Sequence, residues 1–367
     1  MKLLKGKTIY TVATGCNKSK SLQDLIRPLI DDGANIIFLP TEQAQKIASF
    51  NDEIFSKCIM KIENGTDATE TLPEEDLVIV APCSFNTFNK LANGIADTYQ
   101  TSIIHNAIGK GKPVIISLSM NTNFWNNFST KTSLSRFENV NNVTVIWPEF
   151  IYNKNGELGK LTMSPFEKVI DTIYKDLKIV RFENCRNIES NNIAKYNKCV
   201  EENIEEFKFF GKVFTENYLT RGNMGCIAKK VSEGILVTSS GCQLSNINKK
   251  NLTLILSHAN KKIEWVGENI PSSESPMFCD IFNSIKDINC ILHSHCGKIT
   301  YSQRTIHLNT KKYHLTGLWR DNEIIKIMQE NNNIANMKLH GQVVGDKTFY
   351  NVLDKILKTY YSLDDDK

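Results

Sequence analysis

Residues 8–17 read TIYTVATGCN, an apolar run rich in β-branched side chains that leads into a turn containing Gly15. A short continuous apolar run of this kind predicts a strand that is buried on both faces. The following segment repeats apolar side chains at the spacing of a helix, at Leu22, Leu25, Ile26 and Leu29. We expect this helix to stop at residues 31–33, which read DDG, and a second strand to occupy residues 35–39. These elements form a βαβ unit.

The same alternation continues through the first half of the chain. Further strand-like runs occur at residues 77–81, 113–118 and 143–147. A repeated βαβ pattern predicts an α/β fold with a Rossmann-like, doubly wound parallel sheet, whose ligands bind at the carboxyl ends of the strands. We expect this domain to span residues 1–180.

The 367 residues are more than one compact core usually contains, so two domains are expected. Residues 182–202 carry many Asn and Glu side chains and little periodicity, which predicts a linker over residues 181–205. Beyond it, strand-like runs at residues 234–238, 252–257, 288–293 and 337–340 mix with helical stretches at residues 277–285 and 322–328. This pattern predicts a second α/β domain with a mixed sheet over residues 206–367.

The composition excludes several classes of function. Hydrophobic residues make up 41% of the chain, but no apolar run approaches the ~20 residues of a membrane span. No export signal is visible over residues 1–7. The net charge of +4 comes from interleaved basic and acidic residues, which disfavours nucleic acid and favours small anionic metabolites. The 10 cysteines are scattered singly, so we expect a reducing, cytoplasmic environment.

Three loops of the first half place small polar residues where strands are expected to end. They are residues 14–17 (TGCN), 81–87 (APCSFNT) and 119–125 (SMNTNFW). Backbone amides at the start of a following helix favour a phosphate group. Because Ser and Asn are also preferred helix caps without any ligand, that alternative stays open for each residue alone.

Together with residues 93–97 (NGIAD), these loops are similar in order and spacing to the homo-oligomeric flavin-containing cysteine decarboxylases, the phosphopantothenoylcysteine decarboxylase family. The resemblance covers residues 5–177. It implies a trimer that binds FMN between subunits, with Met120 and Asn121 also near a substrate carboxylate. The FMN contacts it implies are Gly15, Cys16, Asn17, Thr41, Ser84, Phe85, Asn86, Met120 and Asn121.

Two features of the decarboxylases are absent. Family members place a histidine before the third strand, whereas residues 41–76 contain none and His105 is the only histidine of this half. The branch that serves coenzyme A also uses a cysteine in a flap, and this sequence has Asn155 at that position. We therefore do not expect ordinary pantothenoylcysteine decarboxylation. A catalytically silent flavoprotein module that serves oligomerisation or regulation is the alternative.

The second half places three histidines at or near the ends of strand-like runs. His293 and His295 stand two positions apart, so both project from one face of a strand and can converge on one divalent cation. His340 follows another apolar run, and three imidazoles leave an open coordination position for a catalytic zinc ion. Ordinary hydrogen-bonded strand residues are the alternative interpretation.

Residues 271–276 (PSSESP) open a helical stretch, where hydroxyls and amides can hold a phosphate while Glu274 moves a proton. Residues 221–225 (RGNMG) and 238–241 (TSSG) provide two more loops with backbone donors for the same anion. The alternative is three ordinary turns.

In this order the motifs of the second half are similar to the class II aldolase and adducin family, over residues 207–357. The resemblance implies a tetramer in which His293, His295 and His340 hold Zn²⁺ or another divalent cation and Glu274 is the catalytic acid/base. It implies a substrate phosphate bound by Gly222, Asn223, Ser240, Gly241, Ser272 and Ser273. Related epimerases carry Asp in place of Glu274, which favours aldol cleavage, and a dehydratase acting on a methylthio-ketose phosphate is the close alternative.

We therefore expect a homo-oligomeric fusion enzyme. A metal-dependent, aldol-type lyase acting on a small phosphorylated sugar or carbonyl compound is joined to an FMN-binding, decarboxylase-like domain. The role of Tyr350, Tyr360 and Tyr361 is left open, and His258, His307 and His314 are expected to be structural or surface residues.

Overall fold

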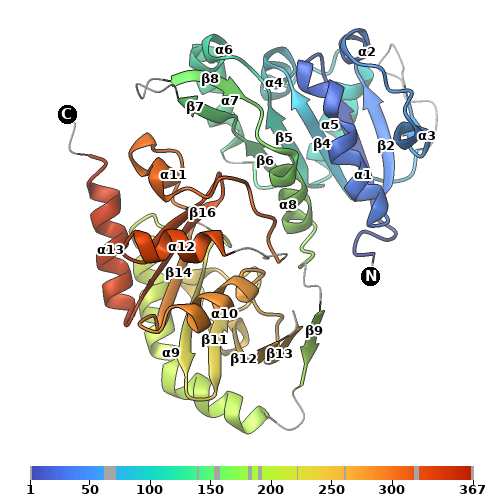
Figure 1. The fold of residues 1–367 in the computed structure, drawn as a ribbon. Helices are drawn as coiled ribbons and strands as arrows, with labels where there is room; N and C mark the ends of the chain where they lie inside the picture. The colour runs from blue at the N-terminus through green and yellow to red at the C-terminus, as the bar shows by residue number, and fades with distance from the viewer. Residues whose placement is uncertain are drawn as a thin grey trace. The chain divides into compact units, whose positions relative to one another are not determined.

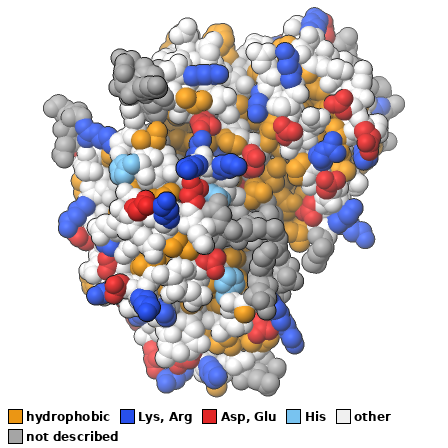
Figure 2. Space-filling model, in the orientation of Figure 1, with side chains coloured by type: hydrophobic (Ala, Val, Ile, Leu, Met, Phe, Trp, Pro, Cys, Tyr) orange, Lys and Arg blue, Asp and Glu red, His pale blue; other side chains and the backbone are white. Residues whose placement is uncertain are grey.

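The computed structural model describes residues 2–61, 72–138, 140–152, 158–180, 184–188, 192–220, 222–259, 262–317 and 322–364. The chain separates into two compact units, Met1–Ile179 and Val180–Lys367, each with a sheet covered by helices (Figure 1). On the face shown in Figure 2, basic and acidic side chains lie among one another rather than in separate blocks. Among the described residues, no helix combines the length and apolar character that crossing a bilayer requires.

The first unit is built on a fully parallel sheet of six strands in the order β3-β2-β1-β4-β5-β6. The predicted Rossmann-like, doubly wound sheet is confirmed. The strand order reverses between β1 and β4, so the carboxyl ends of these strands border the crevice where such folds bind ligands. The strands are β1 (Thr8–Ala13), β2 (Asn35–Pro40), β3 (Ile59–Met60), β4 (Leu77–Cys83), β5 (Val114–Leu118) and β6 (Val143–Ile146).

Helices cover both faces of this sheet. On one face, Phe88 of α4 and Ile104 of α5 pack against β1, β4 and β5. The side chains that α1 buries lie outside that cluster, on the face that α1 shares with α8 (Figure 1). The helices are η1 (Asn17–Ser21), α1 (Gln23–Asp31), α2 (Glu42–Ile47), α3 (Glu53–Ser56), α4 (Phe85–Ala92), α5 (Tyr99–Gly109), α6 (Thr122–Asn126), α7 (Phe128–Phe137) and α8 (Phe166–Asp176).

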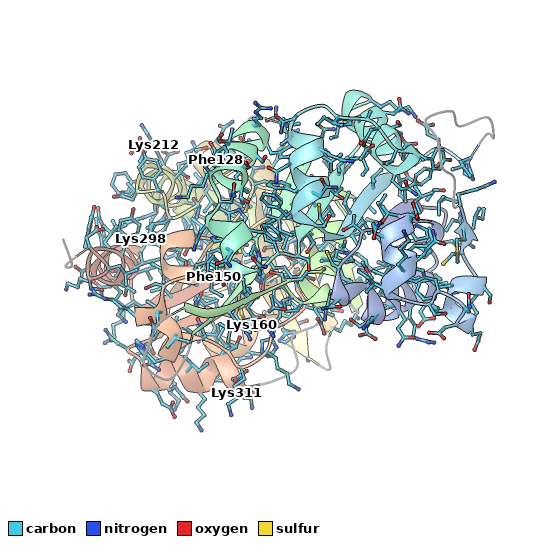
Figure 3. All side chains as sticks on the ribbon, turned by 90° about the horizontal axis from the view of Figure 1, so that it is seen from above. Phe128, Phe150, Lys160, Lys212, Lys298 and Lys311 are labelled. Carbon is cyan, nitrogen blue, oxygen red and sulfur yellow. The ribbon has the colours of Figure 1, made fainter. Side chains whose placement is uncertain are left out.

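An antiparallel hairpin follows the last strand of the parallel sheet. Its strands are β7 (Glu149–Tyr152) and β8 (Leu158–Thr162), which carry Phe150 and Lys160 (Figure 3). The Phe150 ring packs edge-on against Trp125, with ring centroids 5.6 Å apart, and so anchors the hairpin beside α6. Asn155 lies outside the described residues.

The second unit contains an eight-stranded mixed sheet in the order β15-β16-β14-β10-β11-β12-β13-β9. Only the pairing of β13 with β9 is parallel among the described strands of this sheet. The mixed sheet predicted for this half is confirmed. The strands are β9 (Asn184–Asn187), β10 (Cys226–Val231), β11 (Gly234–Thr238), β12 (Leu252–Ala259), β13 (Lys262–Val266), β14 (Cys290–Ser294), β15 (Ile334–Met337) and β16 (Gly341–Asp346).

Two apolar clusters fill the opposite faces of this sheet. Phe207, Phe210 and Phe214 of α9 pack with Phe349 of α13 in one cluster, whereas α10 and α12 contribute to the other. The helices are α9 (Ile193–Glu216), η3 (Leu244–Asn246), η4 (Lys249–Asn251), α10 (Ser275–Ser284), α11 (Gly297–Thr300), η5 (Gln303–Leu308), α12 (Glu323–Glu330) and α13 (Phe349–Tyr361).

The linker predicted over residues 181–205 is wrong. Asn184–Asn187 form β9, which pairs with β13, and α9 begins at Ile193. Tyr196 and Val200 are already buried in the core of the second unit. The segment is polar on average, but its apolar residues form a narrow stripe along α9 that continues past residue 205. Average polarity therefore did not predict this helix.

The strand predicted at residues 337–340 is also wrong. β15 ends at Met337, and the next three residues turn the chain, with Leu339 in the left-handed region at a φ of 57°. The chain returns as β16 from Gly341, which lies so close to β14 that an added Cβ would stand 2.1 Å from the carbonyl oxygen of Ser294. The turn places His340 at one end of the sheet.

Candidate functional site

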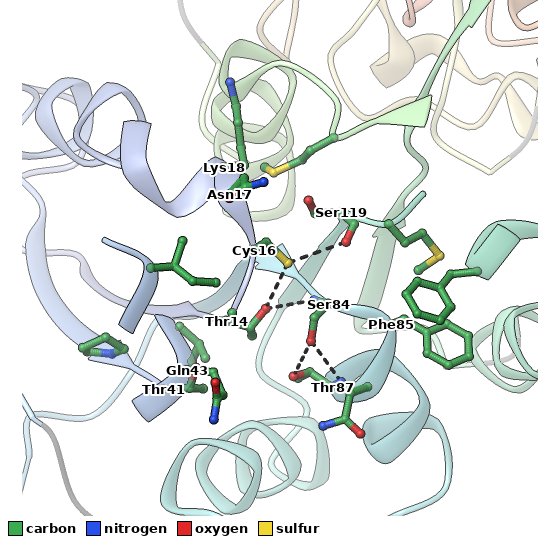
Figure 4. Close-up of a pocket in the computed structure, with 18 of the residues that line it drawn as sticks. Thr14, Cys16, Asn17, Lys18, Thr41, Gln43, Ser84, Phe85, Thr87 and Ser119 are labelled. Atoms are coloured by element: carbon green, nitrogen blue, oxygen red, sulfur yellow. Dashed lines mark hydrogen bonds between the residues drawn. The ribbon is translucent and has the colours of Figure 1, made fainter. Parts of the chain in front are cut away.

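The first unit contains a cavity of about 1130 Å³ at the carboxyl ends of β1, β2, β4 and β5 (Figure 4). Its lining includes every residue for which the sequence predicted a cofactor contact. These residues are Gly15, Cys16, Asn17, Thr41, Ser84, Phe85, Asn86, Met120 and Asn121. Segments far apart in the sequence therefore converge where the strand order reverses.

Hydrogen bonds at the base of the cavity join the ends of three strands. The Thr14 hydroxyl donates to the carbonyl oxygen of Pro82 at 2.8 Å and accepts from the amide of Ser84 at 2.9 Å. The Cys16 thiol donates to the carbonyl oxygen of Ser119 at 3.6 Å (Figure 4). Burial raises the pKa of this thiol, although its hydrogen bonds oppose the shift, so Cys16 stays protonated at neutral pH.

Three of the predicted cofactor residues also cap helices. The side chains of Thr41, Ser84 and Asn121 accept hydrogen bonds from the backbone at the starts of α2, α4 and α6. A residue can both cap a helix and line the cavity. The capping oxygen accepts from one backbone amide of the first turn, and the other free amides of that turn can still donate to a ligand. Asn86 lies inside α4 and caps no helix.

The walls of the cavity are partly aromatic. The rings of Phe85 and Phe124 stack at 4.5 Å with an angle of 14° between their planes. Met120, which is nearly buried, lines the same cavity. A flat apolar surface beside polar loop amides suits a ligand with both a ring system and an anionic group.

The ionisable groups among the described residues that line the cavity are lysines, acidic residues and a cysteine. Lys90 pairs with Asp97 at 2.6 Å, and Lys18 lies over the ring of Phe166 at 4.8 Å from its centroid. Lys160 lines the cavity from β8. Among the described lining residues there is no histidine, and His105 belongs to α5 without being one of them.

The second unit brings together the three histidines predicted to bind a metal. Ligand atoms of His293, His295 and His340 all lie within 4.8 Å of one another. The ring centroid of His293 is 4.5 Å from that of His295 and 5.0 Å from that of His340. The first two project from the end of β14, and the third from the turn before β16.

A hydrogen bond to the neighbouring strand sets the orientation of the His293 imidazole. Its Nδ1 lies 2.9 Å from the carbonyl oxygen of Gln342, and because that oxygen can only accept, Nδ1 must carry the proton. The other nitrogen, Nε2, is buried and has no hydrogen-bond partner among the described residues. Burial lowers the pKa of His293 to about 4, so its Nε2 lone pair is available at neutral pH. An unsatisfied, neutral imidazole nitrogen beside two further imidazoles fits a divalent cation.

Glu274 lies beside this cluster. Its Oε1 is 4.0 Å from Nε2 of His340, and only 7% of the residue is exposed. The Ser272 hydroxyl accepts from the amide of Glu274 at 3.3 Å and donates to the Cys226 thiol sulfur at 3.1 Å. Ser272 thus fixes the backbone that carries Glu274 at the start of α10.

Two of the predicted phosphate loops lie side by side. The amide of Ser240 donates to the carbonyl oxygen of Ile270 at 2.9 Å, and that of Ser272 donates to Thr238 at 3.2 Å. These bonds place Gly241 and Ser273 on adjoining loops. The third loop, with Gly222 and Asn223 exposed, adjoins the histidines instead, because the amide of His295 donates to the carbonyl oxygen of Leu219 at 3.2 Å.

The sequence did not single out Tyr313. Its ring stacks on that of His340 at 5.9 Å, with 21° between the planes. The Thr310 hydroxyl, which accepts from the amide of Lys338 at 3.0 Å, ties the two segments together. Tyr313 and His340 are 27 residues apart, and no spacing rule relates such positions. Only the tertiary contact shows that Tyr313 lies beside His340.

The remaining histidine and tyrosine candidates make other contacts or are exposed. His258 and His314 contact Asp280 and Glu323, at 3.5 and 3.3 Å, and His307 is exposed. Tyr350, 66% exposed, packs against Phe210, and Tyr360 lies under the ammonium group of Lys298.

Comparisons with known proteins match the two units separately. The Flavoprotein family model matches residues 2–178, and the model for the Class II Aldolase and Adducin N-terminal domain matches residues 210–359. A putative phosphopantothenoylcysteine decarboxylase of Dictyostelium discoideum is 30% identical over 186 residues, which are 47% of this chain and 94% of that protein. The chain belongs to the flavoprotein family in its first unit and to the class II aldolase and adducin family in its second.

Two further matches are more distant. The coenzyme A biosynthesis bifunctional protein CoaBC of Thermococcus kodakarensis is 22% identical over 281 residues, and the alignment covers 75% of this chain but only 64% of that protein. The crystal structure of YgbL, a putative aldolase/epimerase/decarboxylase from Klebsiella pneumoniae, is 16% identical, with a TM-score of 0.37. That match covers 44% of this chain and 87% of YgbL.

Both family resemblances inferred from the sequence are confirmed. The flavoprotein unit contains the polar and aromatic cavity, and the class II aldolase unit contains the three histidines beside Glu274. The chain therefore carries one decarboxylase-like unit and one aldolase-like unit.

Proposed function

We propose that the aldolase unit is a metal-dependent lyase that cleaves a carbon-carbon bond of a small phosphorylated sugar or carbonyl compound by aldol chemistry. One observation carries the proposal. Three imidazoles have ligand atoms within 4.8 Å of one another, and Glu274 lies 4.0 Å from one of them. The proposed ligands of Zn²⁺ or another divalent cation are His293, His295 and His340.

The proposed chemistry divides between the ion and the side chains. A bound divalent cation polarises a substrate carbonyl and stabilises the negative charge that develops as the adjacent bond breaks. Glu274, almost completely buried, transfers a proton to or from the substrate carbon or hydroxyl. Backbone amides and hydroxyls orient the substrate through its phosphate. The proposed phosphate ligands are Gly222, Asn223, Ser240, Gly241, Ser272 and Ser273.

For the flavoprotein unit we propose FMN as the cofactor. Membership of the flavoprotein family, the cavity of about 1130 Å³ and the stacked pair Phe85 and Phe124 support this assignment. Bound FMN supplies a reversible electron acceptor. The proposed contacts are Gly15, Cys16, Asn17, Thr41, Ser84, Phe85, Asn86, Met120 and Asn121.

A linked flavin reaction and a catalytically silent module are both compatible with FMN binding. The absence of a histidine among the described residues that line the cavity favours a unit that does not perform ordinary cysteine decarboxylation. We further propose a homo-oligomer based on trimers or tetramers. The described cysteines are all free thiols, which supports a cytoplasmic location.

The test is metal and flavin analysis of the purified full-length protein, followed by assays with a panel of ketose 1-phosphates. We expect about one divalent ion per chain, a yellow chromophore, and aldehyde release that a chelator abolishes and added Zn²⁺ restores. Water loss without bond cleavage would identify the dehydratase alternative. Lyase activity in a colourless protein would support the silent module, and a metal-free, inactive protein would contradict the lyase proposal.

A further inference from the structure

One buried side chain contacts the segments that carry all three histidines. Gln342 lies in β16, two residues after His340, and has 0% of its surface exposed. We infer that Gln342 is the positioning residue that holds the three imidazoles at the mutual distances needed to bind one cation. The inference rests on the proposed function, because it concerns the same site.

The backbone of Gln342 fixes the first histidine. Its carbonyl oxygen accepts from Nδ1 of His293 at 2.9 Å, which sets the tautomer and turns the imidazole so that Nε2 is the ligand atom. This contact requires β16 to lie close to β14. Gly341 permits it, because an added Cβ there would stand 2.1 Å from the oxygen of Ser294 and 3.3 Å from Cε1 of His293.

The side-chain oxygen of Gln342 fixes the second histidine from both sides. It accepts from the hydroxyl of Ser294 at 2.6 Å and from the amide of Cys296 at 3.2 Å. These two residues directly flank His295. These two hydrogen bonds hold the end of β14 where the chain leaves the sheet. They thereby set the direction of the His295 side chain.

The side-chain nitrogen of Gln342 fixes the third histidine. It donates to Oδ1 of Asn336 at 3.1 Å and to the hydroxyl of Thr300 at 2.8 Å. Asn336 and Gln342 are also paired residues of β15 and β16, so they close the base of the turn that carries His340. Within that turn, the amide of His340 donates to the carbonyl oxygen of Met337 at 2.9 Å.

The Gln342 amide uses both its acceptor and its donor, so no other side chain of similar size reproduces the set. Glutamate keeps the acceptor oxygen but lacks the amide donors, and methionine keeps the shape but neither function. Breaking the network also removes a hydrogen-bond partner of the Ser294 hydroxyl and of Oδ1 of Asn336, while the Thr300 hydroxyl keeps its bond to the carbonyl oxygen of Cys296. The loss should therefore appear in cation affinity before any substrate is added.

The experiment compares Gln342→Met and Gln342→Glu with the wild-type full-length chain, using Zn²⁺ alone as the probe. Affinity is measured by competition with a chromophoric chelator, and the absorption spectrum of the Co²⁺ form reports ligand geometry. We expect Gln342→Met to weaken Zn²⁺ binding by about 10- to 100-fold and to alter the Co²⁺ spectrum, with Gln342→Glu intermediate.

A matched control removes a different buried amide from the same unit. Asn203 is 8% exposed, donates to Cys199 and accepts from Lys229, which keeps Glu206 as a partner. Asn203→Leu should cost stability and leave Zn²⁺ affinity unchanged. His293→Ala provides the reference for loss of a ligand.

The outcomes separate this inference from the proposed function. If Gln342→Met binds Zn²⁺ as tightly as Asn203→Leu while His293→Ala does not, the positioning role is wrong and the metal site stands. If the wild type and His293→Ala bind Zn²⁺ equally, the metal site itself fails, and the positioning role with it. If Gln342→Met does not fold, Ser294→Ala replaces it, and affinity equal to wild type in that variant overturns the inference.

Discussion

The cavity of the flavoprotein unit and the histidine cluster of the aldolase unit use their polar groups in opposite ways. Around the cavity, Thr41, Ser84 and Asn121 are committed to helix starts, and Cys16 donates within the loop framework. In the cluster, Nε2 of His293 is buried without a hydrogen-bond partner among the described residues. These polar side chains around the cavity thus make hydrogen bonds within the protein, whereas the cluster leaves one imidazole nitrogen of His293 without such a bond among the described residues.

This difference supports the proposed position of the metal site. A buried group that finds no partner in the protein is costly unless something else binds it. The cavity shows no such cost at the residues discussed, and its described lining includes no imidazole. The comparison supports the proposed metal chemistry of the aldolase unit and the proposed FMN binding of the flavoprotein unit, and mutations can test both proposals.

The largest expected effect is that of His293→Ala. Removing the ligand should abolish metal binding and lower lyase activity by at least about 10³-fold, because several kcal/mol of charge stabilisation are lost. Metal content, activity and flavin content of the purified variant check this. The exposed His307→Ala is the control and should leave all three unchanged, while loss of flavin in His293→Ala would contradict the separation of the two sites.

Glu274→Gln should lower kcat by about 10²- to 10³-fold while the metal stays bound, because the amide cannot transfer a proton. Steady-state kinetics and metal analysis on the same preparation test it. Glu268→Gln, at a half-exposed residue that pairs with Lys250, is the matched control and should behave as wild type. A normal kcat in Glu274→Gln would remove this carboxylate from the mechanism.

The pH dependence of the free energy of unfolding tests whether His293 is buried in its neutral form. His293 has its pKa lowered from 6.5 to about 4 by burial, so between these values the unfolded chain binds more protons than the folded chain. The metal-free protein should therefore lose stability as pH falls from about 6.5 to 4, by at most about 3.5 kcal/mol from this group. Urea unfolding with chelator present should show a shallower dependence in His293→Gln, and identical slopes would contradict the assignment.

The smallest expected effect is that of Ser84→Ala in the cavity. Loss of the cap on α4 should cost about 1 kcal/mol of stability, and FMN affinity should fall by about threefold to tenfold. Thr348→Ala removes a comparable cap from α13 in the other unit and should leave FMN affinity unchanged. Equal FMN affinity in both variants would mean that Ser84 only caps its helix.

Local sequence patterns predicted much of the fold and of the two candidate sites. The β-branched run at residues 8–12 and the loop that follows predicted both the parallel sheet and the cavity at its edge, because βαβ units admit few arrangements. The spacing of His293 and His295 predicted that both project from one face of a strand. Polarity misplaced the start of the second unit, since α9 needs only a narrow apolar stripe to be buried.

Periodicity and loop composition act over a few residues, so they were enough to predict the two folds and the chemical types of side chain at each site. Three features could be found only in the folded molecule: His340 lies in the turn before β16, Tyr313 stacks on it, and Gln342 contacts the segments of all three histidines. Such contacts join positions far apart in the chain, and the packing of the whole sheet, rather than any local preference, brings them together.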